Sequence, residues 1–146
     1  MSKLVFVDCE AIGPAPCVGA VVVENGALTS NYFHAVITLE STESTMWKSF
    51  DLWLEQLDNG KRLVMVSDNP AFDFQWVNHG LWRYCNRSLL GHSARRISDY
   101  YAGLTGDFWN TQRWKRMRTT PHDHNALHDA RGNAEAFLRI QAGERV

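Results

Sequence analysis

The sequence predicts an α/β fold in which helices pack against a mixed β-sheet. KLVFV (3–7) is a short apolar run rich in β-branched residues, which predicts a buried central strand ending at Asp8. Two further β-rich runs lie within 17–39, on either side of Asn25-Gly26, a dipeptide typical of tight hairpin turns. A fourth strand is predicted at 62–67 between two segments of helical periodicity. Antiparallel strands followed by a strand flanked by helices are typical of a mixed sheet.

Apolar residues at helical spacing predict the helices. The first apolar stripe precedes Asn59-Gly60, the second follows the turn signal Asn69-Pro70, and the last lies near the end of the chain. These stripes are Trp47, Phe50, Leu54 and Leu57; Phe72, Trp76, Val77 and Leu81; and Ala126, Ala130, Ala134, Phe137 and Leu138. A further helix is expected around 93–103. A fifth strand is expected either within 104–120 or as a short element.

Length and composition favour one ordinary globular domain, residues 1–146. Apolar residues make up 45% of the chain, and no run approaches the roughly 18 apolar residues of a membrane span. The three cysteines, Cys9, Cys17 and Cys85, show no paired spacing. This pattern favours reduced thiols and a cytoplasmic location over a disulfide scaffold.

Charge is distributed unevenly along the chain, although the net charge is only −1. Residues 1–80 carry 4 basic and 10 acidic side chains, which sum to −6, whereas residues 81–146 carry 11 and 6, which sum to +5. The excess of positive charge in the C-terminal part is compatible with contact to a polyanion. A solvated surface with uneven charge would give the same pattern.

Asp8 and Glu10 follow the first predicted strand. Alternate residues of a strand point to the same side, so two carboxylates would lie side by side at its end. Their repulsion, about 4 kcal/mol at 4 Å and an effective dielectric near 20, favours a bound cation. Oxygen ligands of this kind select Mg²⁺ or Mn²⁺. The alternative is a frayed strand end with both groups in water.

Asp73 lies a few residues after the strand predicted at 62–67, where the next helix begins. It is the second candidate acidic site, although the helix dipole alone would favour an aspartate there. Asp68 competes with it but lies in the turn beside Asn69-Pro70, where aspartate is locally expected.

HDHNALHD (122–129) holds three histidines and two aspartates at the start of the last helix. Asp129 falls in the first turn, where the dipole favours a carboxylate. His124 is a candidate to take a proton from water near neutral pH, and His122 and His128 compete for that role. A zinc site of these histidines with a cysteine is an alternative, but no Cys-x-x-Cys or His-Glu-x-x-His spacing supports it.

Three motifs in this order resemble those of the DEDDh superfamily of 3′→5′ exonucleases, which includes DnaQ-like and ribonuclease T-like enzymes. VFVDCE supplies Asp8 and Glu10, NPAFD supplies Asp73, and HNALHD supplies His124 and Asp129. The related subclass has tyrosine four residues before the last aspartate, where this chain has Asn125. One departure is Ala11-Ile12, where many members have threonine after the glutamate.

The resemblance implies a ribonuclease-H-like fold with a mixed five-stranded sheet whose first three strands are antiparallel. It also implies that four carboxylates hold two Mg²⁺ or Mn²⁺ ions: Asp8, Glu10, Asp73 and Asp129. His124 would be the general base in a hydrolysis that releases nucleoside 5′-monophosphates from single-stranded 3′ ends. The compact chain resembles exoribonuclease-like members, which favours RNA slightly over DNA, and the family allows a homodimer. The alternative is a catalytically inactive nucleic-acid-binding module on the same fold.

The segment WNTQRWKRMR (109–118) interleaves basic and aromatic residues. Cations contact phosphates and aromatic faces stack on single-stranded bases. We therefore expect nucleic-acid contacts from Arg113, Lys115, Arg116, Arg118 and Trp114. The alternative is a basic surface loop whose tryptophans, Trp109 and Trp114, pack into the core.

Overall fold

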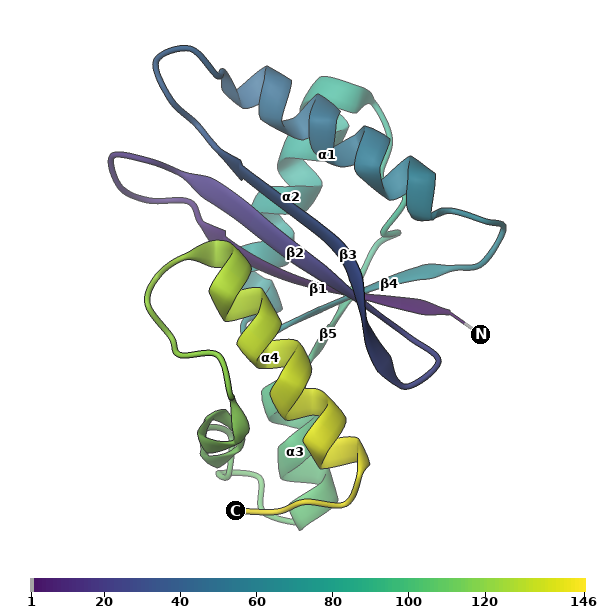
Figure 1. Ribbon diagram of the computed structural model, residues 1–146, viewed down its shortest axis with the longest axis vertical. Helices are drawn as coiled ribbons and strands as arrows, with labels where there is room; N and C mark the ends of the chain where they lie inside the picture. Colours follow the sequence, from purple (N-terminus) through teal and green to yellow (C-terminus); the bar gives the residue numbers. More distant parts are fainter. Residues whose placement is uncertain (1) are drawn as a thin grey trace.

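The computed structural model describes residues 2–146 as a twisted mixed sheet covered on both faces by helices (Figure 1). The five strands are β1 (Lys3–Glu10), β2 (Cys17–Glu24), β3 (Ala27–Val36), β4 (Leu63–Ser67) and β5 (Ala94–Arg96). The helices are α1 (Glu43–Leu57), α2 (Pro70–Cys85), α3 (Ile97–Thr105) and α4 (Ala126–Gln141), with the 3₁₀ helix η1 (Arg113–Met117). The strand order is β3-β2-β1-β4-β5.

The sheet is antiparallel across β3, β2 and β1 and parallel across β1, β4 and β5, which confirms the predicted fold class. The hairpin between β2 and β3 turns at Asn25 and Gly26, whose φ angles are 54° and 76°. Both positions need positive φ in this type of turn, so the dipeptide predicted the turn correctly. No helix among residues 2–146 has the length and apolar composition needed to cross a bilayer.

The fifth strand is the short option and does not lie within 104–120. Ala94–Arg96 pairs in parallel with Met65–Ser67 of β4, so the helix expected around 93–103 begins only at Ile97. Three residues carry no periodic pattern of their own. The strand exists because the edge of β4 offers backbone partners, and that information is not local to the sequence.

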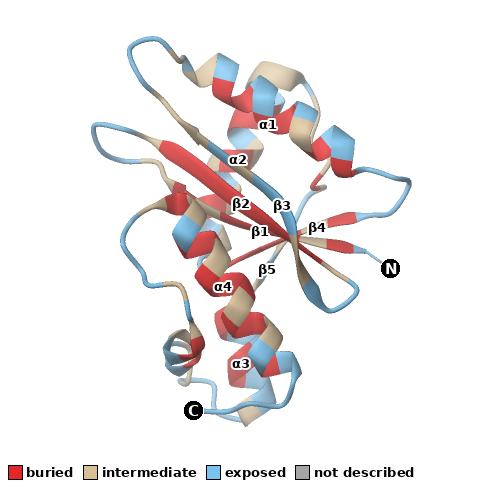
Figure 2. Cartoon of the chain, in the orientation of Figure 1, coloured by how far each residue is buried: buried red, intermediate tan, exposed pale blue. Residues whose placement is uncertain are grey.

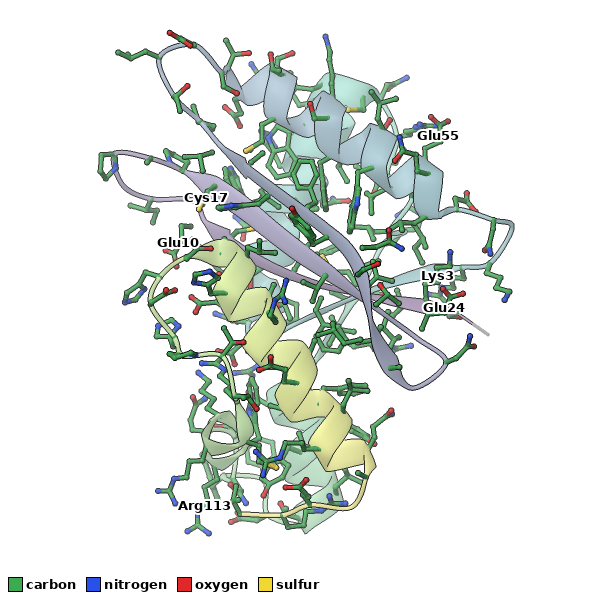
Figure 3. All side chains as sticks on the ribbon, in the orientation of Figure 1. Lys3, Glu10, Cys17, Glu24, Glu55 and Arg113 are labelled. Atoms are coloured by element: carbon green, nitrogen blue, oxygen red, sulfur yellow. The ribbon has the colours of Figure 1, made fainter. Side chains whose placement is uncertain are left out.

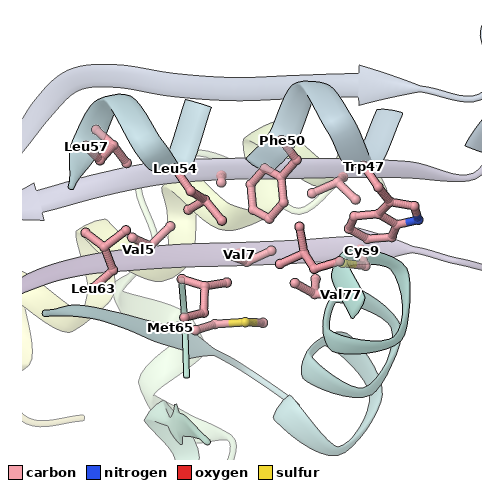
Figure 4. Packing of buried hydrophobic residues seen from close by; sticks show 14 of the residues in the cluster. Val5, Val7, Cys9, Trp47, Phe50, Leu54, Leu57, Leu63, Met65 and Val77 are labelled. Carbon is pink, nitrogen blue, oxygen red and sulfur yellow. The ribbon is translucent and has the colours of Figure 1, made fainter. Parts of the chain in front are cut away.

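Two hydrophobic layers lie on opposite faces of the sheet (Figure 2). On one face α1 and α2 pack against alternate residues of the central strand, including Val5, Val7 and Cys9 (Figure 4). On the other face Phe6 packs with α4, its ring centroid 5.2 Å from that of Phe137. The side chains of β1 therefore alternate between two helical layers, which fixes the face on which each residue beyond Val7 projects.

Candidate active site

The C-terminal end of β1 places Asp8 and Glu10 on the α4 face of the sheet, the face that Phe6 occupies. β4 pairs with β1 only as far as Phe6, so the last residues of β1 extend beyond that neighbour. Beyond Phe6 a side chain of α2 replaces β4 as the hydrogen-bond partner of β1: the backbone N–H of Cys9 donates to Oδ1 of Asp73 at 3.0 Å. The first turn of α2 thus brings a third carboxylate to the end of the central strand.

α4 brings the fourth carboxylate. Asn125 caps the helix, its side-chain oxygen accepting from the N–H groups of Leu127 and His128. Asp129 lies one turn inside and is only 2% exposed. Neither of its carboxylate oxygens has a hydrogen-bond donor among residues 2–146. A buried carboxylate without hydrogen-bond donors is costly, and the neighbour that can pair with its charge is the exposed His122, whose Nδ1 lies 2.8 Å from Oδ1.

Gly19 of β2 allows α4 to approach this closely. It pairs with Asp8 across the two strands, and a Cβ atom built on it would lie 2.1 Å from the backbone nitrogen of Leu127. The first turn of α4 therefore rests directly on the sheet beside Asp8. Sequence reasoning missed Gly19, although a lone glycine inside a β-rich run signals close backbone approach.

The carboxylates converge although they are far apart in the sequence. Asp8, Glu10 and Asp129 each offer an oxygen within 4.8 Å of the others. Asp73 lies outside this group of three but is near enough for its charge to act on Asp8. The structure thus gathers the four carboxylates that the motifs single out, with Asp73 set apart on the α2 side. Their role in binding metal stays a prediction.

The pKa of Asp8 is raised to about 8, first by burial and then by the negative charges of Asp73, Asp129 and Glu10. Burial also raises the pKa of Asp73 to about 6. The guanidinium of Arg118 lowers the pKa of Asp8 but is outweighed. These shifts mean that the protein alone compensates the clustered negative charge only in part.

The three histidines take different positions around this cluster. His124 has a φ of 60°, a left-handed conformation, and its Nδ1 lies 3.6 Å from Oε1 of Glu10. His122 Nδ1 lies 2.8 Å from Oδ1 of Asp129 but without hydrogen-bond geometry. His128 instead pairs with Asp123 at 2.7 Å. His124 and His122 therefore both border the carboxylates, whereas His128 is engaged elsewhere.

His122, His124 and Asp129 form a second group whose ligand atoms lie within 4.8 Å of one another. Two of the three histidines considered for a zinc site therefore lie close enough, with Asp129, to share one ion. No cysteine belongs to the group within residues 2–146. Cys9 packs in the α1/α2 layer on the opposite face of the sheet.

Asp68, the competitor of Asp73, lies in a different environment. Its Oδ2 is 2.7 Å from Nζ of Lys115, and its Oδ1 accepts from Ser98 Oγ at 3.3 Å. Arg118 lies 3.9 Å from the same carboxylate, and its guanidinium donates to Oδ1 of Asn133 on α4. Asp68 therefore anchors the basic segment to the fold, and Lys115 and Arg118 are already paired within the protein.

The expectation that Trp114 stacks on bases is wrong. Its side chain is 0% exposed, and Nε1 donates to Ser98 Oγ at 3.1 Å and to the Thr111 carbonyl at 3.0 Å. Trp114 is a core residue that holds η1 against α3. The other tryptophan of the segment, Trp109, is 85% exposed. The interleaved pattern could not tell the two apart.

A divalent cation is expected to stabilise the protein more strongly at pH 8 than at pH 5. Asp8 has a folded pKa of about 8 against 3.8 for the free group, so the native state binds more protons between these values. Stability without metal should therefore fall as the pH rises through this range. Bound Mn²⁺ should reverse the loss, adding about 2.7 kcal/mol at 100 times its Kd.

The measurement is the melting temperature in EDTA and in excess Mn²⁺ across this pH range. Asp129→Asn should remove most of the Mn²⁺ shift, whereas Glu40→Gln, at an exposed loop position, should retain it. A shift that is absent, or equal in the two variants, would show that these carboxylates bind no metal.

Comparison with known proteins gives one partial likeness. No family model matches the chain. A curated relative, the 3'-5' DNA exonuclease Cap18 of Escherichia coli, is 30% identical over 97 residues, which cover 62% of this chain. The match spans about half of that relative, 52% of its length. The chain is thus similar to part of a protein that is named for exonuclease activity on DNA.

Proposed function

We propose that this protein is a metal-dependent 3′→5′ exonuclease of the DEDDh type, releasing nucleoside 5′-monophosphates from single-stranded ends. The observation that carries the proposal is the convergence of Asp8, Glu10 and Asp129 within 4.8 Å, with Asp73 bonded to the backbone beside them. The likeness to part of a 3'-5' DNA exonuclease supports the same reaction. The proposed binding partner is therefore a nucleic-acid 3′ end.

The residues present fit a pair of Mg²⁺ or Mn²⁺ ions. All four candidate ligands are carboxylates, the donors that these cations prefer. Asp129 has two buried oxygens without hydrogen-bond donors, and burial, followed by the charges of Asp73, Asp129 and Glu10, raises the pKa of Asp8 to about 8. Asp8, Glu10, Asp73 and Asp129 would hold the ions. When bound, such ions stabilise negative charge on the phosphate oxygens and lower the pKa of water.

His124 is the proposed general base. Its Nδ1 faces Glu10 at 3.6 Å, so a proton on that nitrogen is directed towards a carboxylate. Nε2 is then the atom that accepts the proton of the attacking water. The new bond joins the water oxygen to phosphorus, and the bond from phosphorus to the 3′-oxygen breaks. The 3′-oxygen takes a proton from solvent, leaving a shortened strand and a nucleoside 5′-monophosphate.

His124→Ala is expected to lower kcat by about 10² to 10⁴, the usual contribution of a positioned base. His122→Ala, its matched control on the same loop, should lose less than tenfold if His122 only borders Asp129. The assay follows the stepwise shortening of a 5′-labelled oligonucleotide with Mn²⁺. A larger loss in His122→Ala than in His124→Ala would reassign the base. Full activity in excess EDTA would exclude the metal-dependent reaction altogether.

The slight preference for RNA stays a prediction, whereas the partial relative is named for DNA. Discrimination depends on contacts to the 2′-hydroxyl, so matched RNA and DNA strands in one assay decide between them. A homodimer and a cytoplasmic location likewise stay predictions. Binding without hydrolysis under any metal would favour the inactive nucleic-acid-binding module.

A further inference from the structure

Two aromatic side chains project into solvent from the loop between α3 and η1. Phe108 is 78% and Trp109 is 85% exposed, with ring centroids 5.1 Å apart in an edge-to-face pair. The loop is held by its own hydrogen bonds, since the N–H of Trp109 donates to Asp107 Oδ1 at 3.0 Å and the N–H of Thr111 to the Trp109 carbonyl at 2.9 Å. The rings are therefore displayed by an ordered loop.

Both rings line a groove of about 640 Å³ between α3 and this loop. Large apolar side chains this exposed, side by side and bordering a groove, are typical of a binding surface. The charge around them indicates which kind of partner fits. Residues 106–118 contain four basic side chains and one acidic, although the whole chain has a net charge of −1.

The basic side chains of this segment fall into two groups. Lys115 and Arg118 are paired with Asp68, as described above. Arg113 and Arg116 have exposed side chains and neither an ion pair nor a side-chain hydrogen bond with any residue of 2–146. Two free guanidinium groups next to two exposed rings match a single-stranded nucleic acid, whose phosphates need cations and whose bases stack on aromatic faces.

η1 connects this surface to the candidate active site. Its C-terminal end leads to Arg118, whose guanidinium donates to Oδ1 of Asn133, one helical turn beyond Asp129 on α4, and its N-terminal end is Arg113. Glu10 and Arg113 lie along the same edge of the view in Figure 3, with η1 and the loop that leads to α4 between them. A 3₁₀ helix of five residues is roughly 10 Å long, which is within reach of a short single strand.

We propose that Phe108, Trp109, Arg113 and Arg116 form an aromatic–arginine patch that binds the single-stranded segment on the 5′ side of the terminal nucleotide. The inference rests on the nucleic-acid substrate of the proposed function. A strand whose 3′ end lies at the carboxylates runs along η1 and stacks on the two rings. A second copy of the chain fits less well, because two positively charged patches would repel each other.

The test measures binding of a 5′-labelled single-stranded DNA of about 12 nucleotides, within the range that stacking grooves cover. All variants in the binding assay also carry Asp8→Asn and are measured with Mn²⁺, so that the DNA is not degraded during the measurement. Trp109→Ala should raise Kd about tenfold, as expected for the loss of one stacked base. Trp82→Ala, which removes a 45% exposed tryptophan on α2, is the matched control and should change Kd less than twofold.

The charge is tested separately. Arg113→Glu should reduce the slope of log K against log salt by about 0.7 or more, whereas Lys61→Glu, an exposed position outside the patch, should leave the slope unchanged. In the otherwise wild-type protein, Trp109→Ala should raise KM for a strand of about 12 nucleotides. This increase should be roughly tenfold larger than the increase in KM for a dinucleotide, which is too short to reach the patch.

The outcomes separate this inference from the proposed function. If the wild type hydrolyses the strand but Trp109→Ala and Arg113→Glu behave like their controls, the patch is overturned and the proposed exonuclease activity is supported. Patch-dependent binding without hydrolysis under any metal supports the patch and overturns the exonuclease. A wild type that neither binds nor hydrolyses single strands overturns both.

Discussion

Asp8→Asn is expected to lose about a thousandfold or more in kcat and yet to melt at a higher temperature than the wild type in EDTA at pH 8. The loss of activity follows because Asp8 belongs to the cluster with Glu10 and Asp129 and is near enough to feel the charge of Asp73. Several kcal/mol of charge stabilisation depend on a complete set. The gain in stability follows because the same carboxylate lowers the free energy of unfolding when no cation is bound beside it.

The sign of the stability change comes from the pKa. Burial and the neighbouring carboxylates raise the pKa of Asp8 from 3.8 to about 8, so ionising it costs free energy in the native state only. Asparagine removes that cost while keeping the shape of the side chain. The benefit should be absent near pH 4 and grow to about 2 kcal/mol at pH 8, less than the full linkage value because an amide must be buried instead.

Asp51→Asn is the matched comparison, since Asp51 is also buried but is satisfied by Arg87. The guanidinium of Arg87 donates to the Asp51 carboxylate at 2.8 to 3.1 Å. This variant should therefore be destabilised by about 1–3 kcal/mol at pH 8 and remain active. Thermal unfolding in EDTA, paired with the nuclease assay, measures both effects. An Asp8→Asn protein less stable than the wild type at pH 8 would show that the charge cluster is already compensated.

The elements whose sequence signals are local were predicted correctly. The hairpin at Asn25-Gly26 follows from backbone sterics, and the long helices follow from apolar spacing and capping residues. The candidate site was named from the resemblance of the three motifs to DEDDh exonucleases, because each carboxylate alone was also explained by a solvated strand end or by a helix dipole. Sequence periodicity placed Asp8 and Glu10 on one face, and β1 places them there.

The features that were missed or wrong depend on tertiary contacts. β5 forms because β4 offers an unpaired edge. Trp114 and Trp109 are five positions apart in the same basic segment, yet Trp114, within η1, is buried and Trp109 is exposed. Only the packing against Ser98 and Thr111 distinguishes them. Position in the sequence gives residue type and spacing, whereas exposure is set by elements distant along the chain.

Gly19→Ala is expected to destabilise the protein by about 3 kcal/mol and to reduce activity well beyond what the loss of folded protein explains. The added Cβ would meet the backbone of α4, 2.1 Å from the nitrogen of Leu127 and 2.2 Å from the carbonyl carbon of Ala126. Backbone atoms in a capped first turn cannot rotate away as a flexible side chain can, so the helix must shift as a unit. That shift moves Asp129, three residues along the helix, away from Asp8.

Gly103→Ala is the control, because it makes the same substitution where a Cβ meets nothing within 4 Å and the residue lies inside α3. It should be neutral or stabilising by up to about 1 kcal/mol, the helix propensity of alanine over glycine. Urea unfolding gives the stabilities of the two variants, and the activity per folded molecule of Gly19→Ala against the wild type in Mn²⁺ gives the effect on the site. If Gly19→Ala retained wild-type activity per folded molecule, the position of Asp129 beside β2 would not matter for the reaction. Asp129, the ligand that α4 contributes, would then have to be removed from the proposed metal-binding set.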